Sequence, residues 1–211
     1  MLFCASRAYC ASLAPYHPLT RSTSLPPLLP RVSGTFTARY TTDNNAIFDL
    51  SLDLTDFTGE ASTCTVENGL TYHVHSFWTN ETVTSSANAF CGPAYTGGHY
   101  DPSLACSGAS EDAKAGCVAL GRTADQGYTY PCNSDDFSDG HLAQCEIGDL
   151  SGKFGSLQGG SRIFRKSFVD TIAPFTANYK AADDLANMWS SVVFHCKDDA
   201  SRLVCAELVE C

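Results

Sequence analysis

The stretch Thr71-Tyr72-His73-Val74-His75-Ser76-Phe77-Trp78 places two histidines one residue apart among residues that favour a β-strand. Residues i and i+2 of a strand project from the same face, so His73 and His75 can aim both imidazoles at one point. Such a pair can begin a metal site. Because two histidines can also share a strand face by chance, the rest of the chain has to supply further ligands.

Later stretches supply further metal-binding side chains. A loop rich in Gly and Pro contains His99, and a second strand ends in His195. Cys145-Glu146-Ile147-Gly148-Asp149-Leu150 adds two carboxylates, and the chain closes with Ser201-Arg202-Leu203-Val204-Cys205. Four imidazoles that come from a strand, a loop and another strand suit copper, because imidazole serves both Cu(II) and Cu(I).

In this order the segments resemble those of the copper/zinc superoxide dismutase family. The resemblance covers residues 34–211, and it rests on the HxH, His-aromatic-Asp-Pro, Gly-Asp-Leu, Val-Val-x-His and Ser-Arg-Leu-x-Cys segments. It implies an all-β fold, namely a Greek-key β-sandwich or flattened barrel with long disulfide-pinned loops. It also implies a copper-dependent enzyme that converts the superoxide anion to O2 and H2O2.

The resemblance assigns roles to individual residues. It implies that the copper ligands are His73, His75, His99 and His195. It also makes His99 the acid–base candidate. Arg202 corresponds to the arginine that guides the anion, a task that suits a guanidinium because it is always charged and offers several donors.

Two departures make the chain most similar to the copper-only superoxide dismutases of fungi and oomycetes. The segment between His195 and Arg202 is short, whereas the copper/zinc enzymes insert a long charged loop there. Glu146 stands where a zinc-binding member has a zinc-ligating histidine. The resemblance therefore implies a secreted monomer with an open copper site and no zinc.

Without zinc, the second ring nitrogen of His99 needs another partner, and the Glu146 carboxylate is the natural one. Asp149 is then free to stabilise its loop through backbone amides. The alternative is a zinc site made of His99, His141, Glu146 and Asp149, since carboxylates are legitimate zinc ligands. His141 does not match the family's zinc-ligand spacing, and its polar surroundings in the sequence predict a solvated side chain.

Eleven cysteines in 211 residues favour an oxidising compartment, so we expect an extracellular protein, either secreted or at the cell surface. The resemblance implies a disulfide between Cys91 and Cys205. Local pairs that the sequence suggests but does not fix are Cys106 with Cys117 and Cys132 with Cys145. Cys4 and Cys10 fall within residues 1–33 and are expected to leave with that leader. The cysteines that then remain, of which one should be left over, are Cys64, Cys196 and Cys211.

Charge and composition restrict the remaining classes. The net charge of −10 argues against nucleic-acid binding, which needs clustered basic residues. No apolar run approaches the roughly 20 residues that span a bilayer. Residues 1–33 contain three arginines, several prolines and no acidic residue, so they predict a targeting or disordered leader. Residues 34–211 are then one superoxide dismutase-like β-barrel domain.

The pattern of residues agrees with the all-β class. Residues 34–40 and 46–54 alternate with the period of a strand, and residues 163–169 and 188–195 continue the pattern. Residues 102–144 are rich in Gly, Ser, Asp and Cys and lack periodicity, which predicts a long loop pinned by its own disulfides. The segment at 180–187 is the one that suggests a helical turn.

Two further hypotheses follow from the sequence. A catalytically silent copper-binding or structural module with the same fold is the alternative to the enzyme, although Arg202 together with four candidate ligands favours the enzyme. Asn80-Glu81-Thr82 is an N-glycosylation sequon, which a secreted eukaryotic protein can use as a glycan site; the alternative is a chance sequon that carries no glycan.

Overall fold

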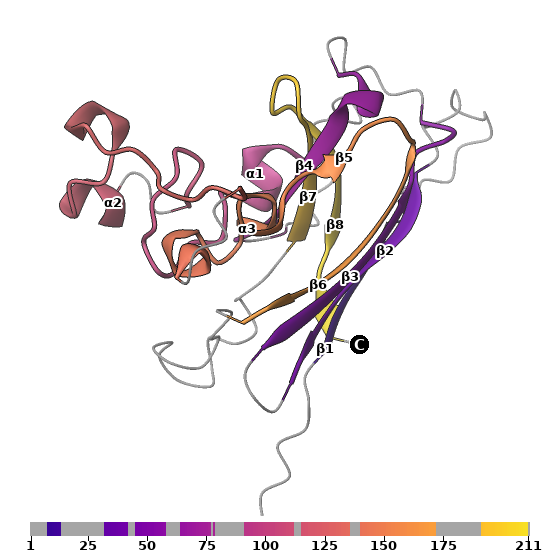
Figure 1. Cartoon of the computed structure of the whole chain (residues 1–211), viewed down its shortest axis with the longest axis horizontal. Coiled ribbons are helices and arrows are strands. Elements are labelled where there is room, and N and C mark those ends of the chain that lie inside the picture. Colours follow the sequence, from indigo (N-terminus) through magenta and orange to yellow (C-terminus); the bar gives the residue numbers. More distant parts are fainter. Residues whose placement is uncertain are drawn as a thin grey trace, which may run out of the picture.

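The computed structural model of the chain describes residues 8–13, 32–41, 45–57, 64–76, 78, 91–111, 115–135, 140–171 and 191–210. Within these ranges nine strands form two antiparallel sheets, which pack as a β-sandwich (Figure 1). The predicted all-β class is confirmed. In the part of the chain that is described, no helix has the length and apolar character needed to cross a membrane.

The first sheet has five strands. Their order is β6 (Ile163–Asp170), β3 (Ala46–Asp53), β2 (Ser33–Tyr40), β1 (Ala8–Leu13) and β9 (Val209–Glu210). Every second side chain of β3 is buried and those between are partly exposed, as the period of two in the sequence predicted.

The second sheet has four strands. Their order is β5 (Leu157–Gln158), β4 (Gly69–His75), β7 (Ser191–Cys196) and β8 (Arg202–Glu207). Every residue of β7 is buried, so both faces of this strand are covered. One face packs in the core, and the other carries a histidine of the candidate site.

The core lies between the two sheets. Aromatic side chains from both sheets meet there. The ring centroid of Phe168 in the first sheet lies 5.1 Å from that of Phe48 and 6.0 Å from that of Tyr72 in the second sheet. Each fully buried large apolar side chain stabilises the fold by about 1.5–3 kcal/mol relative to an exposed one. This core holds β4 and β7 rigidly side by side.

The connections between the sheets are of the Greek-key type. From β3 the chain crosses to β4 in the second sheet, and after β5 it returns so that β6 lies beside β3. At its end the chain passes from β8 to β9, which pairs with β1. The described strands form two separate sheets that do not close into a barrel, so the sandwich describes the fold better than the flattened barrel.

Strand β1 lies within residues 1–33, which the composition predicted as a leader. In the structure, residues 8–13 pair along their whole length with β2, and Tyr9 and Cys10 also pair with β9. The composition did not indicate this strand, because residues 8–13 show no alternation of polar and apolar residues. Residues 1–7 and 14–31 lie outside the described part of the chain.

Short helices and disulfide-pinned loops lie beside the second sheet (Figure 1). The α-helices are α1 (Pro93–Thr96), α2 (Gly116–Ala119) and α3 (Leu150–Phe154). The 3₁₀ helices are η1 (Val66–Asn68), η3 (Ala124–Gln126) and η4 (His141–Gln144). The predicted helical turn at 180–187 and the sequon at Asn80 lie outside the described residues.

Two disulfides pin the long loop, as its composition predicted. They join Cys106 to Cys117 and Cys132 to Cys145. The carboxylate of Asp101 supports the start of the loop, since it accepts hydrogen bonds from the backbone N–H groups of Ala105 (2.9 Å) and Cys106 (2.8 Å). Disulfides, and carboxylates that accept backbone hydrogen bonds, order a segment that has few hydrogen bonds of helices or strands of its own.

Candidate metal centre

Strand β4 carries His73 and His75 on the outer face of the second sheet. The residues that alternate with them, Tyr72 and Val74, belong to the core between the sheets. Because successive side chains of a strand point to opposite faces, burial of these two residues turns the histidines outward. Neighbouring β7 pairs antiparallel with β4 and brings His195 to the same region.

The fourth imidazole, that of His99, comes from a loop that lies beside the end of β4. Residues 97–100 run beside the end of the strand, where the Tyr100 N–H donates to the Val74 carbonyl (3.0 Å) and His99 forms an antiparallel bridge with His75. The sheet therefore continues into the loop for one residue pair, and this pairing fixes where the imidazole of His99 enters.

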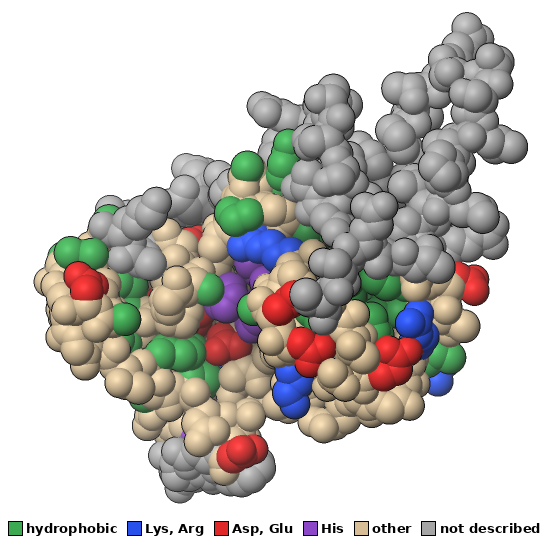
Figure 2. Space-filling model, turned by 90° about the horizontal axis from the view of Figure 1, so that it is seen from above, with side chains coloured by type: hydrophobic (Ala, Val, Ile, Leu, Met, Phe, Trp, Pro, Cys, Tyr) green, Lys and Arg blue, Asp and Glu red, His purple; other side chains and the backbone are tan. Residues whose placement is uncertain are grey.

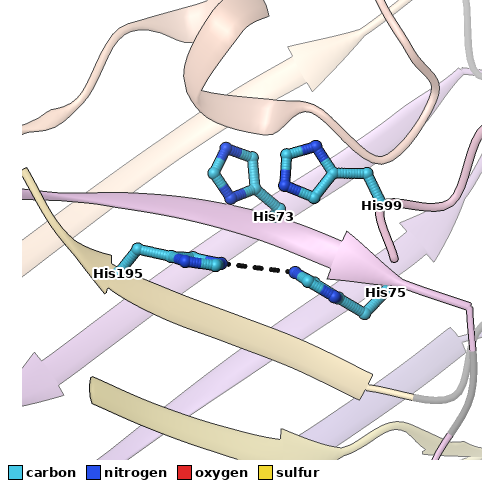
Figure 3. Close-up of side chains that lie close together, drawn as sticks. All are labelled: His73, His75, His99 and His195. Atoms are coloured by element: carbon cyan, nitrogen blue, oxygen red, sulfur yellow. Dashed lines mark hydrogen bonds between the residues drawn. The ribbon is translucent and has the colours of Figure 1, made fainter. Parts of the chain in front are cut away.

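The four candidate ligands converge. One ring nitrogen from each of His73, His75, His99 and His195 lies within 4.8 Å of the others (Figure 3). The four residues are between 0% and 9% exposed. Figure 2 shows histidine side chains surfacing in the middle of one face, between basic and acidic side chains, so the cluster is nearly buried yet open to solvent on one side.

Backbone carbonyls orient two of the imidazoles. His75 Nδ1 lies 3.1 Å from the Gly97 carbonyl oxygen, and His195 Nδ1 lies 3.0 Å from that of Ala200. A carbonyl can only accept, so each Nδ1 carries the proton and donates it. The Nε2 atoms, which lie 3.3 Å apart (Figure 3), are left facing the centre.

Carboxylates orient the other two imidazoles. His99 Nδ1 donates to Glu146 Oε2 at 2.8 Å, and His73 Nε2 lies 3.4 Å from Asp149 Oδ1. These two rings stack with their centroids 4.0 Å apart. The nitrogens left for a ligand are Nε2 of His99 and Nδ1 of His73.

The imidazoles of His73, His75 and His195 stay neutral at neutral pH. Burial, together with the charge of neighbouring groups, lowers the pKa of His73 to about 4 and the pKa of His195 to about 3. Burial lowers the pKa of His75 as well. Burial would raise the pKa of Asp149, but its hydrogen bond and charge interactions with His73 hold that pKa below the usual range. Metals bind the neutral form of imidazole, so the rings of His73, His75 and His195 do not have to release a proton when a metal binds.

No family model and no curated protein matches the chain. Solved structures match it over nearly its whole length. Superoxide dismutase 5 of Candida albicans in a mutant form aligns with a TM-score of 0.52 and 16% identity, covering 98% of this chain and 92% of that chain. The same protein with Cu(II) aligns with a TM-score of 0.51 and 16% identity, covering 98% and 93%. The two proteins share a fold.

The inward nitrogens fit a metal ion that prefers imidazole. Nδ1 of His73 is buried, and none of the described residues offers it a hydrogen-bond partner. A buried polar atom without a partner is costly and calls for an explanation, which a bound ion would supply. The cluster offers four nitrogen donors, because the nearby carboxylates contact the ring nitrogens that face away from the centre. It could therefore hold one of the metals that bind imidazole well.

Arg202, predicted as the anion guide, lies next to the cluster at the start of β8. Its guanidinium donates to the carbonyls of Cys91 (2.9 Å) and Gly97 (2.8 Å) and to the Thr96 hydroxyl. The Gly97 carbonyl also holds His75, so Arg202 and this imidazole share an acceptor. The side chain is partly buried, and a guanidinium has more N–H donors than these three contacts use.

His141 corrects one expectation. Its side chain was predicted to be solvated, but it is 5% exposed at the start of η4. Neither ring nitrogen has a hydrogen-bond partner in the described part of the chain. Polar composition of a loop does not predict burial once disulfides fold the loop onto a sheet. Among the described residues, His141 is outside both groups of converging ligand atoms.

Two disulfides lie next to the site. One joins Cys91 to Cys205, the pair that the resemblance implied, and fastens the loop before His99 to β8. The other joins Cys64 to Cys196, a pairing that the sequence left open. It holds the residue directly after His195. The segments of His99 and His195 are therefore cross-linked eight residues before and one residue after the candidate ligand, respectively.

Sequence reasoning missed the groups that orient the ligands. The carbonyls of Gly97 and Ala200 carry no side-chain signal, and they become partners only when the loops are folded. Tyr130 contacts both Glu146 and Asp149 from the long loop, and the loop sequence has no periodicity that distinguishes it from the nearby Tyr128.

Proposed function

We propose that this protein is a copper-dependent superoxide dismutase, which converts two superoxide anions and two protons to O2 and H2O2. The observation that supports it is the convergence of four imidazoles whose outer nitrogens are all held by the protein, with Arg202 beside them. The four-nitrogen set suits both oxidation states of copper. Bound copper would supply the one-electron chemistry, and the protein would position the imidazoles and guide the anion.

His73, His75, His99 and His195 would hold the copper. His99 is also the acid–base candidate, because Nδ1 is fixed by the charged Glu146 and Nε2 is directed to the open centre. Glu146 is fully buried, and its second oxygen accepts from the Ser107 backbone N–H at 2.7 Å. A carboxylate held in this way orients the imidazole and raises its basicity, the task that a second metal would otherwise perform.

Glu146→Gln tests this role. The amide is nearly the same size and its oxygen can still accept from His99, but the negative charge is lost. We expect copper to remain bound, with a dismutation rate lower by about 10- to 100-fold. Pulse radiolysis of the copper-loaded variant measures the rate, and elemental analysis measures the copper. A wild-type rate at full copper occupancy would show that Glu146 has no catalytic part.

Arg202→Ala should slow the reaction with superoxide while copper stays bound. Electrostatic guidance raises association rates by about 10- to 1,000-fold and weakens with ionic strength, so we expect at least a 10-fold loss at low salt and a smaller one at high salt. Arg39→Ala, on the exposed side of the first sheet, removes the same charge and is the control. Equal effects of the two substitutions would mean that Arg202 gives no local guidance.

The disulfides support an extracellular location. Four are formed within the described residues, and their cysteines lie in β7, in β8 and in the segments outside the strands. Disulfides of this density persist in oxidising compartments and are rare in the cytosol. We therefore propose that the protein acts on superoxide outside the cell, as an antioxidant enzyme.

A metal analysis combined with an activity assay tests the function. The full chain, purified with its disulfides intact and loaded with Cu(II), should contain one copper and no stoichiometric zinc, and dismutation should disappear when copper is removed. Copper binding without dismutation would indicate the silent copper-binding module. Stoichiometric zinc whose removal lowers activity would indicate a two-metal site.

A further inference from the structure

Tyr130 lies in the disulfide-pinned loop, and its hydroxyl group contacts both carboxylate-bearing residues of the candidate site. The backbone N–H of Glu146 donates to the hydroxyl oxygen at 2.8 Å. The hydroxyl in turn donates to Asp149 Oδ2 at 3.0 Å. The same hydroxyl group therefore accepts a hydrogen bond from Glu146 and donates one to Asp149.

Each carboxylate makes these contacts while it orients an imidazole. Asp149 Oδ1 accepts from the Gly152 backbone N–H at 2.7 Å and lies near His73, so Oδ2 is the oxygen left for Tyr130. Glu146 uses both side-chain oxygens on other groups, and Tyr130 therefore reaches it through the backbone. The phenol fixes the two residues relative to each other, three positions apart in the chain.

The two imidazoles that depend on these residues are the stacked pair, His73 and His99. They differ from His75 and His195, which the main chain orients. A shift of Glu146 relative to Asp149 would move one ring of the stacked pair against the other, and their inward nitrogens with them. Loss of a single supporting hydrogen bond at a metal-site carboxylate is the kind of change that alters metal affinity by about 10- to 100-fold.

We propose that Tyr130 is a positioning residue of the metal centre, which sets the relative placement of His73 and His99 through Asp149 and Glu146. This inference rests on the proposed metal centre and deepens it. The long loop then also contributes to the site, because it supplies the Tyr130 hydroxyl that connects Glu146 to Asp149.

The local chemistry supports this assignment. Burial, with the charges of Asp149 and Glu146, raises the pKa of Tyr130 above its usual value, so the phenol keeps the proton that it donates. The disulfide between Cys132 and Cys145 joins the same two segments, two residues after Tyr130 and directly before Glu146. Loss of the hydroxyl therefore leaves the loop attached, and a Tyr130→Phe variant should fold.

The chain provides a matched control. Tyr128 lies two residues earlier in the same loop, and its hydroxyl donates to the Ala105 carbonyl at 2.7 Å. Tyr128→Phe removes a hydroxyl of equal chemistry that contacts no carboxylate of the site. Any effect common to both variants reports on loop stability, and any effect confined to Tyr130→Phe reports on the metal centre.

The experiment compares Tyr130→Phe, Tyr128→Phe and wild type as full, disulfide-intact chains. We expect Tyr130→Phe to weaken Cu(II) affinity by about 10-fold in a chelator competition and to change the Cu(II) electron paramagnetic resonance spectrum. In metal-free protein, ¹⁵N NMR should show altered imidazole resonances of His73 and His99. Tyr128→Phe should match wild type in all three measurements.

The outcomes separate this inference from the proposed function. If Tyr130→Phe and Tyr128→Phe give the same copper affinity, spectra and imidazole resonances, Tyr130 has no positioning role, even when wild type binds copper. If wild type binds no copper, the proposed function fails, while the NMR comparison of the metal-free variants still decides whether Tyr130 places the stacked imidazoles.

Discussion

His75→Ala is expected to abolish tight copper binding and dismutation while the β-sandwich remains folded. His75 is fully buried, and its Nε2 lies 3.3 Å from the equivalent atom of His195 at the heart of the cluster. Structural Zn²⁺ sites with four ligands bind with about 10–16 kcal/mol, which corresponds to roughly 3 kcal/mol per ligand. A similar contribution from His75 to copper binding means that its loss should lower the affinity by about 100-fold or more. Chelator competition with Cu(II) measures this loss, and circular dichroism checks the fold.

His141→Ala is the matched control for this prediction. It also removes a buried imidazole, but from outside the cluster. We expect copper affinity and activity to stay at wild-type levels. Wild-type copper affinity in His75→Ala would remove the basis of the proposed centre. Loss of a bound zinc in His141→Ala would instead support the alternative zinc site.

Asp170→Ala is expected to cause the largest loss of stability. Asp170 at the end of β6 pairs with Lys153 of α3, with Nζ and Oδ2 2.6 Å apart and both side chains 1% exposed. Lys153 also donates to the Ile147 carbonyl at 3.0 Å, so the pair ties the segment of Glu146 and Asp149 to the first sheet. Breaking a buried ion pair leaves an uncompensated charge and costs about 3–5 kcal/mol.

Denaturant unfolding of the metal-free chain measures this cost. Asp49→Ala breaks an ion pair with Arg39 of similar length, 2.8 Å, in which both side chains are about half exposed. That control should lose less than about 1 kcal/mol. The double variant Lys153→Met with Asp170→Leu should recover most of the stability, because no buried charge remains. Equal losses for Asp170→Ala and Asp49→Ala would contradict the prediction.

The sequence predicted the parts of the site that depend on local periodicity. The spacing of His73 and His75 puts both on one face of a strand whatever the rest of the chain does, and strand β3 shows its period of two directly. The positions of His99 and Glu146 came from the resemblance, and in the structure their side chains are hydrogen-bonded at 2.8 Å.

Other features depend on long-range folding, which the sequence pattern does not contain. Strand β1 has no alternation, and its place is set by the edges of β2 and β9 that it covers. The disulfide between Cys64 and Cys196 joins residues 132 positions apart, so no local spacing marks it. Burial of His141 depends on how the loop folds over the sheet. These features follow from tertiary contacts and required the structure.

The four imidazoles are oriented in two ways, and substitutions can change one pair of them more easily than the other. His75 and His195 are held by the carbonyls of Gly97 and Ala200, which every amino acid possesses, so no substitution at those two positions deletes the acceptor. His73 and His99 are held by side chains, which one codon can change in charge or length. Variation, whether natural or designed, can therefore tune the electronic character of one half of the centre while the main chain preserves the other.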